Sequence, residues 1–332
     1  ARDKLENLGF NFASTASPGG SGALYLAANN FLDPGDNVLL RDRYWGPYKG
    51  FLENNKLGFV TWPLLPPEAN DEHPYFAKDE FSSQLEELVK TQKKVMVWLN
   101  DPAHNPTGLS MSEHGRIACL ETFVDSALNN ENVGHTLLID SAYSLYADEP
   151  FAWADTILNE IENGMMWPDN LLICVAVSLS KSHTIYGLRT GALVSMHPEK
   201  EVTDRLDTVM SVTGRQTWSA TPRVAQFCVS EMHSSEEGGK AWSDERDRLK
   251  DLLDNRRNIL NSECEKLGVS INPTMDGFFA WIESSDPIAV AEKCAENDVF
   301  LVPLNGGVRI GLCALPTDSI PKVAMALSKA MS

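Results

Sequence analysis

The segment LLICVAVSLSKSHTIYGLRTGALVSM (residues 171–196) decides the fold class. Its first eight and last six residues are apolar runs with the length and composition of buried strands. The polar stretch between them holds Lys181, flanked by hydroxyl groups, and Arg189, eight residues later. In open α/β sheets, ligands bind where a strand ends. The segment therefore predicts an α/β protein with a ligand site beside Lys181, although a surface lysine near a loop arginine would show the same pattern.

Three further apolar runs upstream support this class: NVLLRD (37–42), VMVWLN (95–100) and TLLID (136–140). The segments that separate the runs are long enough to hold helices. Alternation of this kind is typical of a mostly parallel sheet with helices on both faces. We predict this architecture for the N-terminal part of the chain.

The pattern changes near Trp242, where a charged stretch with leucines at helical spacing runs to Gly268. We expect a long linking helix there. Shorter predicted elements follow, at 277–284, 287–297, 299–304 and 308–314, with a last helix from near Asp318. The sequence thus predicts a large domain, residues 1–242, and a smaller C-terminal α+β domain that includes the linking helix, residues 243–332.

Composition excludes several classes of function. The 332 residues carry a net charge of −18, and we expect no nucleic acid or membrane as a partner, because both require a basic surface. The six cysteines form no C-x-x-C pair, which indicates reduced thiols in the cytoplasm and no metal site. The chain begins without methionine, so we expect that an N-terminal arm is missing.

Polar residues also follow two of the other predicted strands. Asp140 ends one strand and Tyr143 comes three residues later; a carboxylate there can keep a pyridine nitrogen protonated, and a phenol can bond a ring oxygen. Asn105 follows the preceding strand in the sequence HNPTG, and its amide can donate to a ring oxygen. Asp140 could instead only cap a following helix or turn, and Asn105 could only form part of a turn.

A glycine-rich turn, SPGGSGAL (17–24), opens an apolar helix. Backbone N–H groups from Gly20 onward and the Ser21 hydroxyl suit a phosphate. The turn is no dinucleotide fingerprint, because Tyr25 occupies the third glycine position, and no Gly-Lys-Ser/Thr of a P-loop follows.

Together and in this order, these motifs closely resemble class I aminotransferases of the aspartate and aromatic amino acid type, which are fold-type I pyridoxal-5′-phosphate (PLP) enzymes. The resemblance runs from SPGGSGAL through HNPTG, D-x-A-Y and S-x-S-K-x-x-x-x-G-x-R-x-G to a C-terminal arginine. It implies that PLP is the cofactor and that Lys181 carries it as a Schiff base and shuttles a proton at Cα. It further implies that Asp140 pairs with the ring nitrogen, and that Tyr143 and Asn105 bond the ring hydroxyl oxygen.

The resemblance also assigns the remaining cofactor contacts. Trp45, in RDRYWGPYK (41–49), matches the aromatic residue that stacks on the cofactor ring, or else is a core tryptophan. Trp45 and Asn105 are also expected to contact the substrate. The phosphate would be held by Gly20, Ser21, Ser178, Ser180 and Arg189.

Two arginines bear on the substrate. Arg309, in VRIGLCAL, matches the arginine that binds the α-carboxylate, although Gly311 stands where the family usually has asparagine. Arg215, in GRQTWSATP, matches the arginine for a second carboxylate, which the partner subunit supplies in this family. The expected substrates are therefore aspartate or glutamate with a 2-oxo acid such as 2-oxoglutarate, in a homodimer with shared active sites. Aromatic aminotransferases share this arginine, so the donor stays open.

The predicted function is a PLP-dependent aminotransferase with ping-pong kinetics. The alternatives are an aromatic amino acid aminotransferase, a PLP-dependent lyase acting at Cβ, and a regulatory module of the same fold without turnover.

Overall fold

The computed structural model of the chain describes residues 2–68, 74–272 and 274–331. The chain divides into two compact units. Unit 1 comprises Ala1–Asp101, Met111–Ala142 and Phe151–Ser235. Unit 2 comprises Pro102–Ser110, Tyr143–Pro150 and Glu236–Ser332, so two short segments between parts of unit 1 group with the C-terminal part of the chain.

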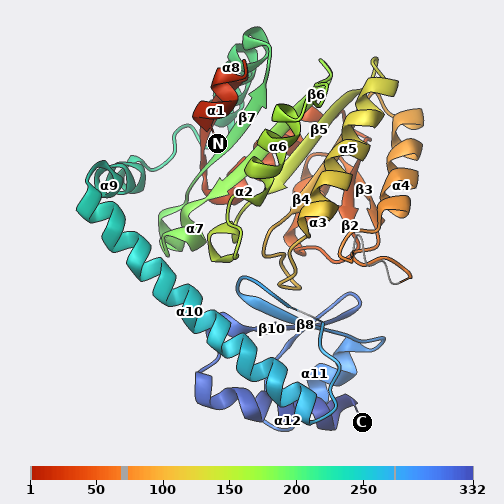
Figure 1. The fold of residues 1–332 in the computed structure, drawn as a ribbon, viewed down its shortest axis with the longest axis vertical. Helices are drawn as coiled ribbons and strands as arrows, with labels where there is room; N and C mark the ends of the chain where they lie inside the picture. Colours follow the sequence, from red (N-terminus) through yellow and green to blue (C-terminus); the bar gives the residue numbers. More distant parts are fainter. Residues whose placement is uncertain (1, 69–73, 273, 332) are drawn as a thin grey trace. The chain divides into compact units, whose positions relative to one another are not determined.

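Unit 1 is built on a seven-stranded sheet with the order β1-β7-β6-β5-β4-β2-β3 (Figure 1). The strands are β1 (Asn11–Pro18), β2 (Asn37–Arg41), β3 (Gly58–Trp62), β4 (Lys94–Asn100), β5 (Gly134–Asp140), β6 (Leu171–Ser178) and β7 (Thr190–His197). All neighbouring pairs from β3 to β6 are parallel, whereas β7 is antiparallel to both β6 and β1. The predicted mostly parallel sheet is confirmed.

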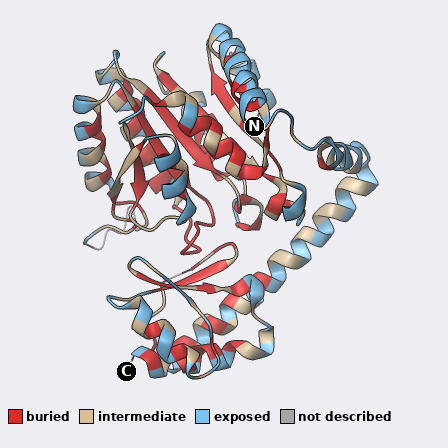
Figure 2. Cartoon of the chain, turned by 180° about the vertical axis from the view of Figure 1, so that it is seen from behind, coloured by how far each residue is buried: buried red, intermediate tan, exposed pale blue. Residues whose placement is uncertain are grey.

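Helices cover both faces of this sheet (Figure 2). Along β4, Val95, Val97 and Leu99 pack into one apolar cluster with α4, α5 and α6, while Met96 and Trp98 pack into another with α2 and α3. Burial of both faces explains the continuous apolar runs of the sequence. The helices of this unit are α1 (Arg2–Asn7), α2 (Gly19–Phe31), α3 (Pro47–Asn54), α4 (Lys78–Thr91), α5 (Glu113–Asn129), α6 (Ala152–Glu162), α7 (Leu179–Ser182), α8 (Lys200–Thr217) and α9 (Arg223–Ser234).

The strand register brings several strand ends to one edge of the sheet. Ser178, the last residue of β6, pairs with Gly191, and Pro18, the last residue of β1, pairs with Thr190. Asp140, the last residue of β5, pairs with Asn100 at the end of β4. The strand-end residues Pro18, Asn100, Asp140 and Ser178 therefore lie along one edge of the sheet.

Unit 2 contains a three-stranded antiparallel sheet with the order β8-β10-β9. Its elements are α10 (Glu236–Lys266), β8 (Phe279–Glu283), α11 (Pro287–Ala295), β9 (Val302–Leu304), β10 (Gly307–Gly311) and α12 (Ile320–Met331). The predicted smaller C-terminal domain is confirmed. The boundary that the sequence predicts after residue 242 lies inside α10 and stays a prediction.

Two helix starts in this unit differ from the prediction. Helix α10 begins at Glu236 rather than near Trp242, because two glycines, Gly238 and Gly239, weaken the helical signal of its first turns. The last helix begins at Ile320, and Asp318 lies in a preceding 3-10 turn rather than at the N-cap. Helix ends are decided by backbone hydrogen bonds that a sequence pattern specifies only loosely.

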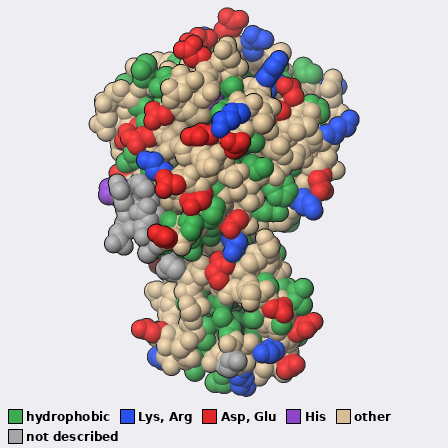
Figure 3. All heavy atoms as spheres, turned by 90° about the vertical axis from the view of Figure 1, so that its right-hand side faces the viewer, with side chains coloured by type: hydrophobic (Ala, Val, Ile, Leu, Met, Phe, Trp, Pro, Cys, Tyr) green, Lys and Arg blue, Asp and Glu red, His purple; other side chains and the backbone are tan. Residues whose placement is uncertain are grey.

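The surface mixes charges of both signs. On the face in Figure 3, acidic and basic side chains are interspersed rather than gathered into one basic area. Among the residues that the structure describes, no helix is long and apolar enough to cross a bilayer. Within the same residues, no group of three or more His, Cys, Asp or Glu side chains could hold a metal ion.

Candidate functional site

Lys181 lies in α7, a single helical turn that directly follows β6. Ser178 caps this turn, and its Oγ accepts a hydrogen bond from the Ser180 backbone N–H at 3.4 Å. The Lys181 Nζ lies 4.6 Å from the centroid of the Tyr186 ring, and the Arg189 guanidinium carbon lies 5.0 Å from the same centroid. One aromatic ring therefore contacts both cations.

Arg189 joins this turn to the glycine-rich turn. Its Nη1 donates to Ser180 Oγ at 3.3 Å, and its Nη2 donates to the Pro18 carbonyl oxygen at 3.3 Å. The residue has a left-handed backbone, with φ of 49°. Such a conformation costs free energy for a residue other than glycine, and the bonds of the guanidinium offset that cost.

The glycine-rich turn itself packs too closely for side chains. A Cβ on Gly19 would lie 2.6 Å from Arg189 Nη2, and a Cβ on Gly20 would lie 3.0 Å from the Ser178 Cβ. Helix α2 starts here, and among the described residues no side chain hydrogen-bonds at its N-cap. The structure thus brings Gly20, Ser178, Ser180 and Arg189 together, with Ser21 next in the chain. Hydroxyls, a guanidinium and helix N–H groups are the donors that a phosphate requires.

Asp140 ends β5 as a buried carboxylate, only 5% exposed. Its Oδ2 accepts a hydrogen bond from the Tyr48 hydroxyl at 2.5 Å, and its Oδ1 accepts one from the Ala142 backbone N–H at 3.1 Å. Burial raises the pKa of Asp140 to about 6, and the two hydrogen bonds act in the opposite direction. In the described parts of the chain no cation pairs with Asp140. The site can therefore accept a positively charged ring nitrogen.

Trp45 lies beside the residue that bonds Asp140. Its ring packs edge-on against Tyr48, with centroids 5.6 Å apart, and Tyr48 in turn packs on Trp98 with centroids 4.6 Å apart. The Trp45 side chain is half-buried, so part of it stays accessible. Its position suits stacking on a planar ligand held by Asp140.

Three other predicted residues come together in unit 2. Arg309, on β10, donates from Nη1 to Asn105 Oδ1 at 3.0 Å, and its guanidinium carbon lies 4.5 Å from the Phe279 ring centroid. The Tyr143 ring packs edge-on against the same Phe279 ring, with centroids 5.5 Å apart. Burial lowers the pKa of Arg309, and the nearby Tyr143 raises it. An amide, a phenol and a guanidinium therefore form one polar group against an aromatic surface.

Arg215 has a different setting. It lies exposed near the end of α8, and its Nη1 donates to Ser219 Oγ at 3.0 Å. The described contacts of Arg215 do not include any of the other predicted residues.

Two further residues, Tyr48 and Asp276, support the candidate site and were not predicted from the sequence. Tyr48 follows Trp45 by three residues at the start of α3, a helical spacing that could have indicated a shared role. Asp276 accepts hydrogen bonds from two loops of unit 2, and no sequence pattern marks it.

The chain matches the family model for aminotransferase class I and II over residues 9–327. It is 25% identical to the aromatic-amino-acid aminotransferase of Paracoccus denitrificans, covering 95% of this chain and 75% of that protein. It is 22% identical to the cytoplasmic aspartate aminotransferase of Schizosaccharomyces pombe, covering 96% of this chain and 75% of that protein.

Solved structures show the same fold. An aminotransferase from Anaerococcus prevotii aligns with a TM-score of 0.87 at 26% identity, covering 97% of this chain and 75% of the other. The aromatic-amino-acid aminotransferase of Burkholderia pseudomallei, solved covalently bound to pyridoxal phosphate, aligns with a TM-score of 0.79 at 21% identity, covering 99% and 77%. The chain therefore belongs to the aminotransferase class I and II family, as the sequence predicted, and is a transaminase.

Proposed function

We propose that this chain is a PLP-dependent aminotransferase in which Lys181 holds the cofactor and moves the proton at the substrate's Cα. The observation that carries the proposal is the convergence of two serines, Arg189 and the glycine-rich turn beside Lys181. Asp140, a buried carboxylate at the same sheet edge with no cation paired to it in the described chain, fits the ring nitrogen. The donor set thus suits both charged ends of PLP.

When bound, PLP supplies a protonated ring that accepts electron density from Cα. The residues of unit 1 support that chemistry. Asp140 keeps the ring nitrogen protonated, because its own charged form is otherwise poorly stabilised in a buried setting. The substrate's amino group would displace the Lys181 amine from the cofactor. The freed amine would then remove the Cα proton and return it to the cofactor's aldehyde carbon, two atoms away, which is general acid–base catalysis by a single group.

The residues of unit 2 bind the substrate and orient the groups that donate to the cofactor. Arg309 offers a planar fork that matches the substrate's α-carboxylate. Since a guanidinium only donates, its bond to Asn105 Oδ1 orients that amide so that its nitrogen is the end that can donate to the ring oxygen. The proposed role of Tyr143 is to donate to the same oxygen.

The proposed amino donor is aspartate or glutamate. Arg215 supports it: the guanidinium is exposed in this chain, as expected of a residue that serves a partner subunit. The acceptor is a 2-oxo acid such as 2-oxoglutarate. Relatives of the aspartate and aromatic types match at similar identity, so aromatic donors are the alternative that the assay below separates.

A homodimer completes the proposal. Helix α9 buries only Ala225, while Val224 and Phe227 are 69% and 65% exposed. Exposed apolar side chains also occur at Tyr186 and Val212. Apolar exposure on this scale is typical of a surface that another subunit covers. Sedimentation should show a dimer that Phe227→Asp weakens.

The cysteines support the proposed cytoplasmic location. In the described chain the six cysteines form no disulfide, and burial raises the pKa of Cys119 and of Cys174 to about 12, which disfavours their reactive thiolates. A chain without disulfides suits a reducing compartment.

A labelling experiment tests the cofactor site. The purified protein is incubated with PLP, reduced with borohydride and digested, and the labelled peptide is identified by mass spectrometry. We expect the label on Lys181 and its loss in Lys181→Ala. Lys200→Ala, which removes an exposed lysine that pairs with Asp204, should keep the label.

Turnover assays then test the reaction. Aspartate, glutamate and phenylalanine are each offered with 2-oxoglutarate, and cystathionine is offered alone to detect lyase activity. Preference for the dicarboxylic donors, with ping-pong kinetics, is the expected result. Labelling of Lys181 without turnover of any donor would contradict the proposed enzymatic activity and favour a regulatory module of the same fold.

A further inference from the structure

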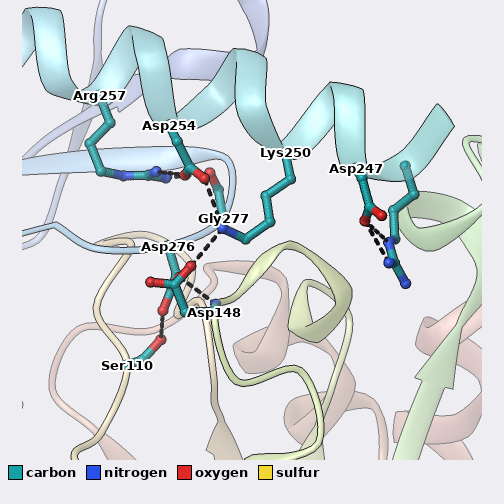
Figure 4. Close-up of polar contacts among 9 residues, drawn as sticks. Ser110, Asp148, Asp247, Lys250, Asp254, Arg257, Asp276 and Gly277 are labelled. Atoms are coloured by element: carbon teal, nitrogen blue, oxygen red, sulfur yellow. Dashed lines mark hydrogen bonds and ion pairs between the residues drawn. The ribbon is translucent and has the colours of Figure 1, made fainter. Parts of the chain in front are cut away.

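A single buried carboxylate links two loops of unit 2. Asp276, 4% exposed, lies just before β8. Its Oδ2 accepts a hydrogen bond from the Ser110 hydroxyl at 2.6 Å, and its Oδ1 accepts one from the Asp148 backbone N–H at 2.9 Å (Figure 4). Ser110 belongs to the segment that carries Asn105, and Asp148 to the segment that carries Tyr143. The carboxylate therefore joins the two loops that present these residues.

The bond to Asp276 also fixes the direction of the Ser110 hydroxyl. Ser110 Oγ accepts a hydrogen bond from the Ala103 backbone N–H at 2.9 Å while it donates to Asp276. Ala103 has a left-handed backbone, with φ of 58°, which costs about 1 kcal/mol or more for a residue with a side chain. The hydroxyl thus helps to hold a strained residue two positions before Asn105.

Backbone hydrogen bonds also join the segments around the Asp276 carboxylate. The Gly108 carbonyl oxygen accepts hydrogen bonds from the N–H groups of Met275 and Asp276, both at 3.0 Å. The Gly277 N–H donates to the Tyr146 carbonyl oxygen at 3.1 Å. The three segments that meet at Asp276 are therefore bonded main chain to main chain, and the carboxylate is the side chain that completes the junction.

Helix α10 supports the junction from outside. Lys250 Nζ donates to Asp148 Oδ1 at 2.6 Å and to Asp254 Oδ2 at 2.7 Å (Figure 4). Arg257 Nη2 donates to the Gly277 carbonyl oxygen at 2.6 Å. The spacing of 250, 254 and 257 puts these residues on one face of the helix. The Arg257 charge partly offsets the cost of burying the Asp276 carboxylate, whose pKa is raised by that burial.

We infer that Asp276 is a positioning residue for transamination: it holds the loops of Asn105 and Tyr143 in register with Arg309, without touching the cofactor or the substrate. The inference rests on the proposed function for the roles of those three residues. It extends that function by naming a residue that acts only through Ser110 and the Asp148 backbone.

Asp276→Asn and Ser110→Ala test this role. An asparagine at 276 can accept only one of the two hydrogen bonds. If its oxygen keeps the Asp148 N–H, its amide nitrogen faces Ser110 Oγ, and the Ser110 hydroxyl loses the acceptor to which it donates. We expect each variant to lower kcat by about tenfold, the effect of losing one hydrogen bond to a charged group, with a smaller change in KM. The pH at which the visible absorbance of the bound cofactor titrates should shift as well, which a purely structural role would not cause.

The double variant and a matched control sharpen the test. Since both residues act through one bond, Asp276→Asn combined with Ser110→Ala should be little worse than Asp276→Asn alone. Asp286→Ala is the control: its carboxylate also accepts a backbone N–H, from Ala289 at 3.0 Å, but it caps α11 and contacts neither loop. It should lower stability and leave kcat and the titration unchanged.

Hydrogen exchange separates failure of this inference from failure of the proposed function. In the protein without PLP, backbone amides of residues 103–110 and 144–148 should exchange faster in both variants and at the wild-type rate in Asp286→Ala. Unchanged exchange would overturn the inference whether or not the protein is an aminotransferase. If exchange rises in an active enzyme but kcat, KM and the titration stay at wild-type values, the positioning role is overturned while the proposed function stands.

Discussion

The two units hold their predicted residues by different means. In unit 1, Asp140 and Ser178 are the last residues of strands, so the hydrogen-bonded ladder of the sheet sets their positions. In unit 2, Asn105 and Tyr143 lie in segments outside any strand, held by hydrogen bonds between loops and by Asp276. Substitutions in unit 1 should therefore change the chemistry and leave the geometry intact, whereas substitutions in unit 2 should change the geometry.

The two buried carboxylates show the same contrast. Asp140 has two hydrogen-bond donors and no cation paired with it within the described residues, and its pKa is raised to about 6. Burial raises the pKa of Asp276 as well, but there the nearby Arg257 acts with the two hydrogen-bond donors in the opposite direction. A carboxylate without a cation suits a cationic ligand, and one with a cation nearby suits a structural junction.

Asp140→Asn should give the largest effect. The amide keeps the shape of the side chain but cannot carry a negative charge opposite a ring nitrogen. We expect kcat to fall by about 10² to 10³-fold, the range for removing one electrostatic contribution at a reacting centre. Steady-state kinetics with aspartate measure this, and Asp155→Asn, on the exposed side of α6, is the control. A wild-type kcat in Asp140→Asn would mean that Asp140 does not have the proposed role at the ring nitrogen.

Arg309→Met should give the next largest effect, and it tests the substrate-binding role of unit 2. The variant loses two charge-assisted hydrogen bonds to the substrate carboxylate, worth about 3 kcal/mol together. That corresponds to a fall in kcat/KM of about 10²-fold. Arg309→Lys, which keeps the charge and loses the planar fork, should recover part of it. Arg246→Met, which removes an arginine paired with Asp247 on α10, should leave kcat/KM unchanged.

The pH dependence of stability tests the Asp140 carboxylate without substrate. Its folded pKa, about 6, lies above the ordinary value of 3.8, so the folded state binds the proton more tightly than the unfolded state does. The contribution of Asp140 is therefore present below pH 4 and is lost as the pH rises from about 4 to about 6. A shift of about two units corresponds to about 3 kcal/mol at most.

Urea unfolding of the protein without PLP measures this contribution. The free energy of unfolding of wild type minus that of Asp140→Asn should fall between pH 4 and pH 6. Other titrating groups cancel in this difference, including His183, whose pKa is lowered to about 4 by burial and by the neighbouring His233. A difference that stays flat over this range would mean that Asp140 is not buried as an unpaired carboxylate.

A pair of glycines tests how tightly the loops of unit 2 are packed. Gly108 has φ of 69°, and a Cβ there would collide with the Phe279 carbonyl oxygen. Gly9 has φ of 93° in open space. Gly9→Ala should cost about 1 kcal/mol from backbone strain alone, and Gly108→Ala about 2 kcal/mol or more. Equal losses in urea unfolding would mean that the loop can move away from β8.

The difference between the strand ends of unit 1 and the loops of unit 2 also explains how much of the site could be predicted from the sequence. The positions of Lys181, Asp140 and Arg189 at or beside strand ends were predictable because apolar runs mark those strands, and a parallel arrangement brings strand ends to one edge. Strands β1 and β3 were missed: NFASTASP alternates small and polar residues, and GFVTW is only partly buried, so neither shows the apolar run of a central strand.

The contacts that hold unit 2 were not predictable from a pattern. Asp276 follows a methionine and precedes a glycine in a turn, a setting in which aspartate is common on any surface. Its role depends on Ser110 and Asp148, which lie 166 and 128 residues away in the chain. Hydrogen bonds between such distant loops leave no periodic signal, whereas a strand does.

Tyr48→Phe should give the smallest effect, and it tests whether unit 1 also depends on a supporting residue. The Tyr48 hydroxyl is 2.5 Å from Asp140 Oδ2, and its hydrogen bond lowers the pKa of that carboxyl against the effect of burial. The variant keeps the ring that packs between Trp45 and Trp98.

Without the hydrogen bond from Tyr48, Asp140 should be protonated at higher pH and hold a ring nitrogen less firmly. We expect PLP affinity and kcat to fall by about tenfold or less, the worth of one hydrogen bond. Tyr44→Phe, whose ring contacts Phe59, is the control. Wild-type affinity in Tyr48→Phe would mean that the strand ends of unit 1 suffice, and that only the loops of unit 2 need a dedicated positioning residue.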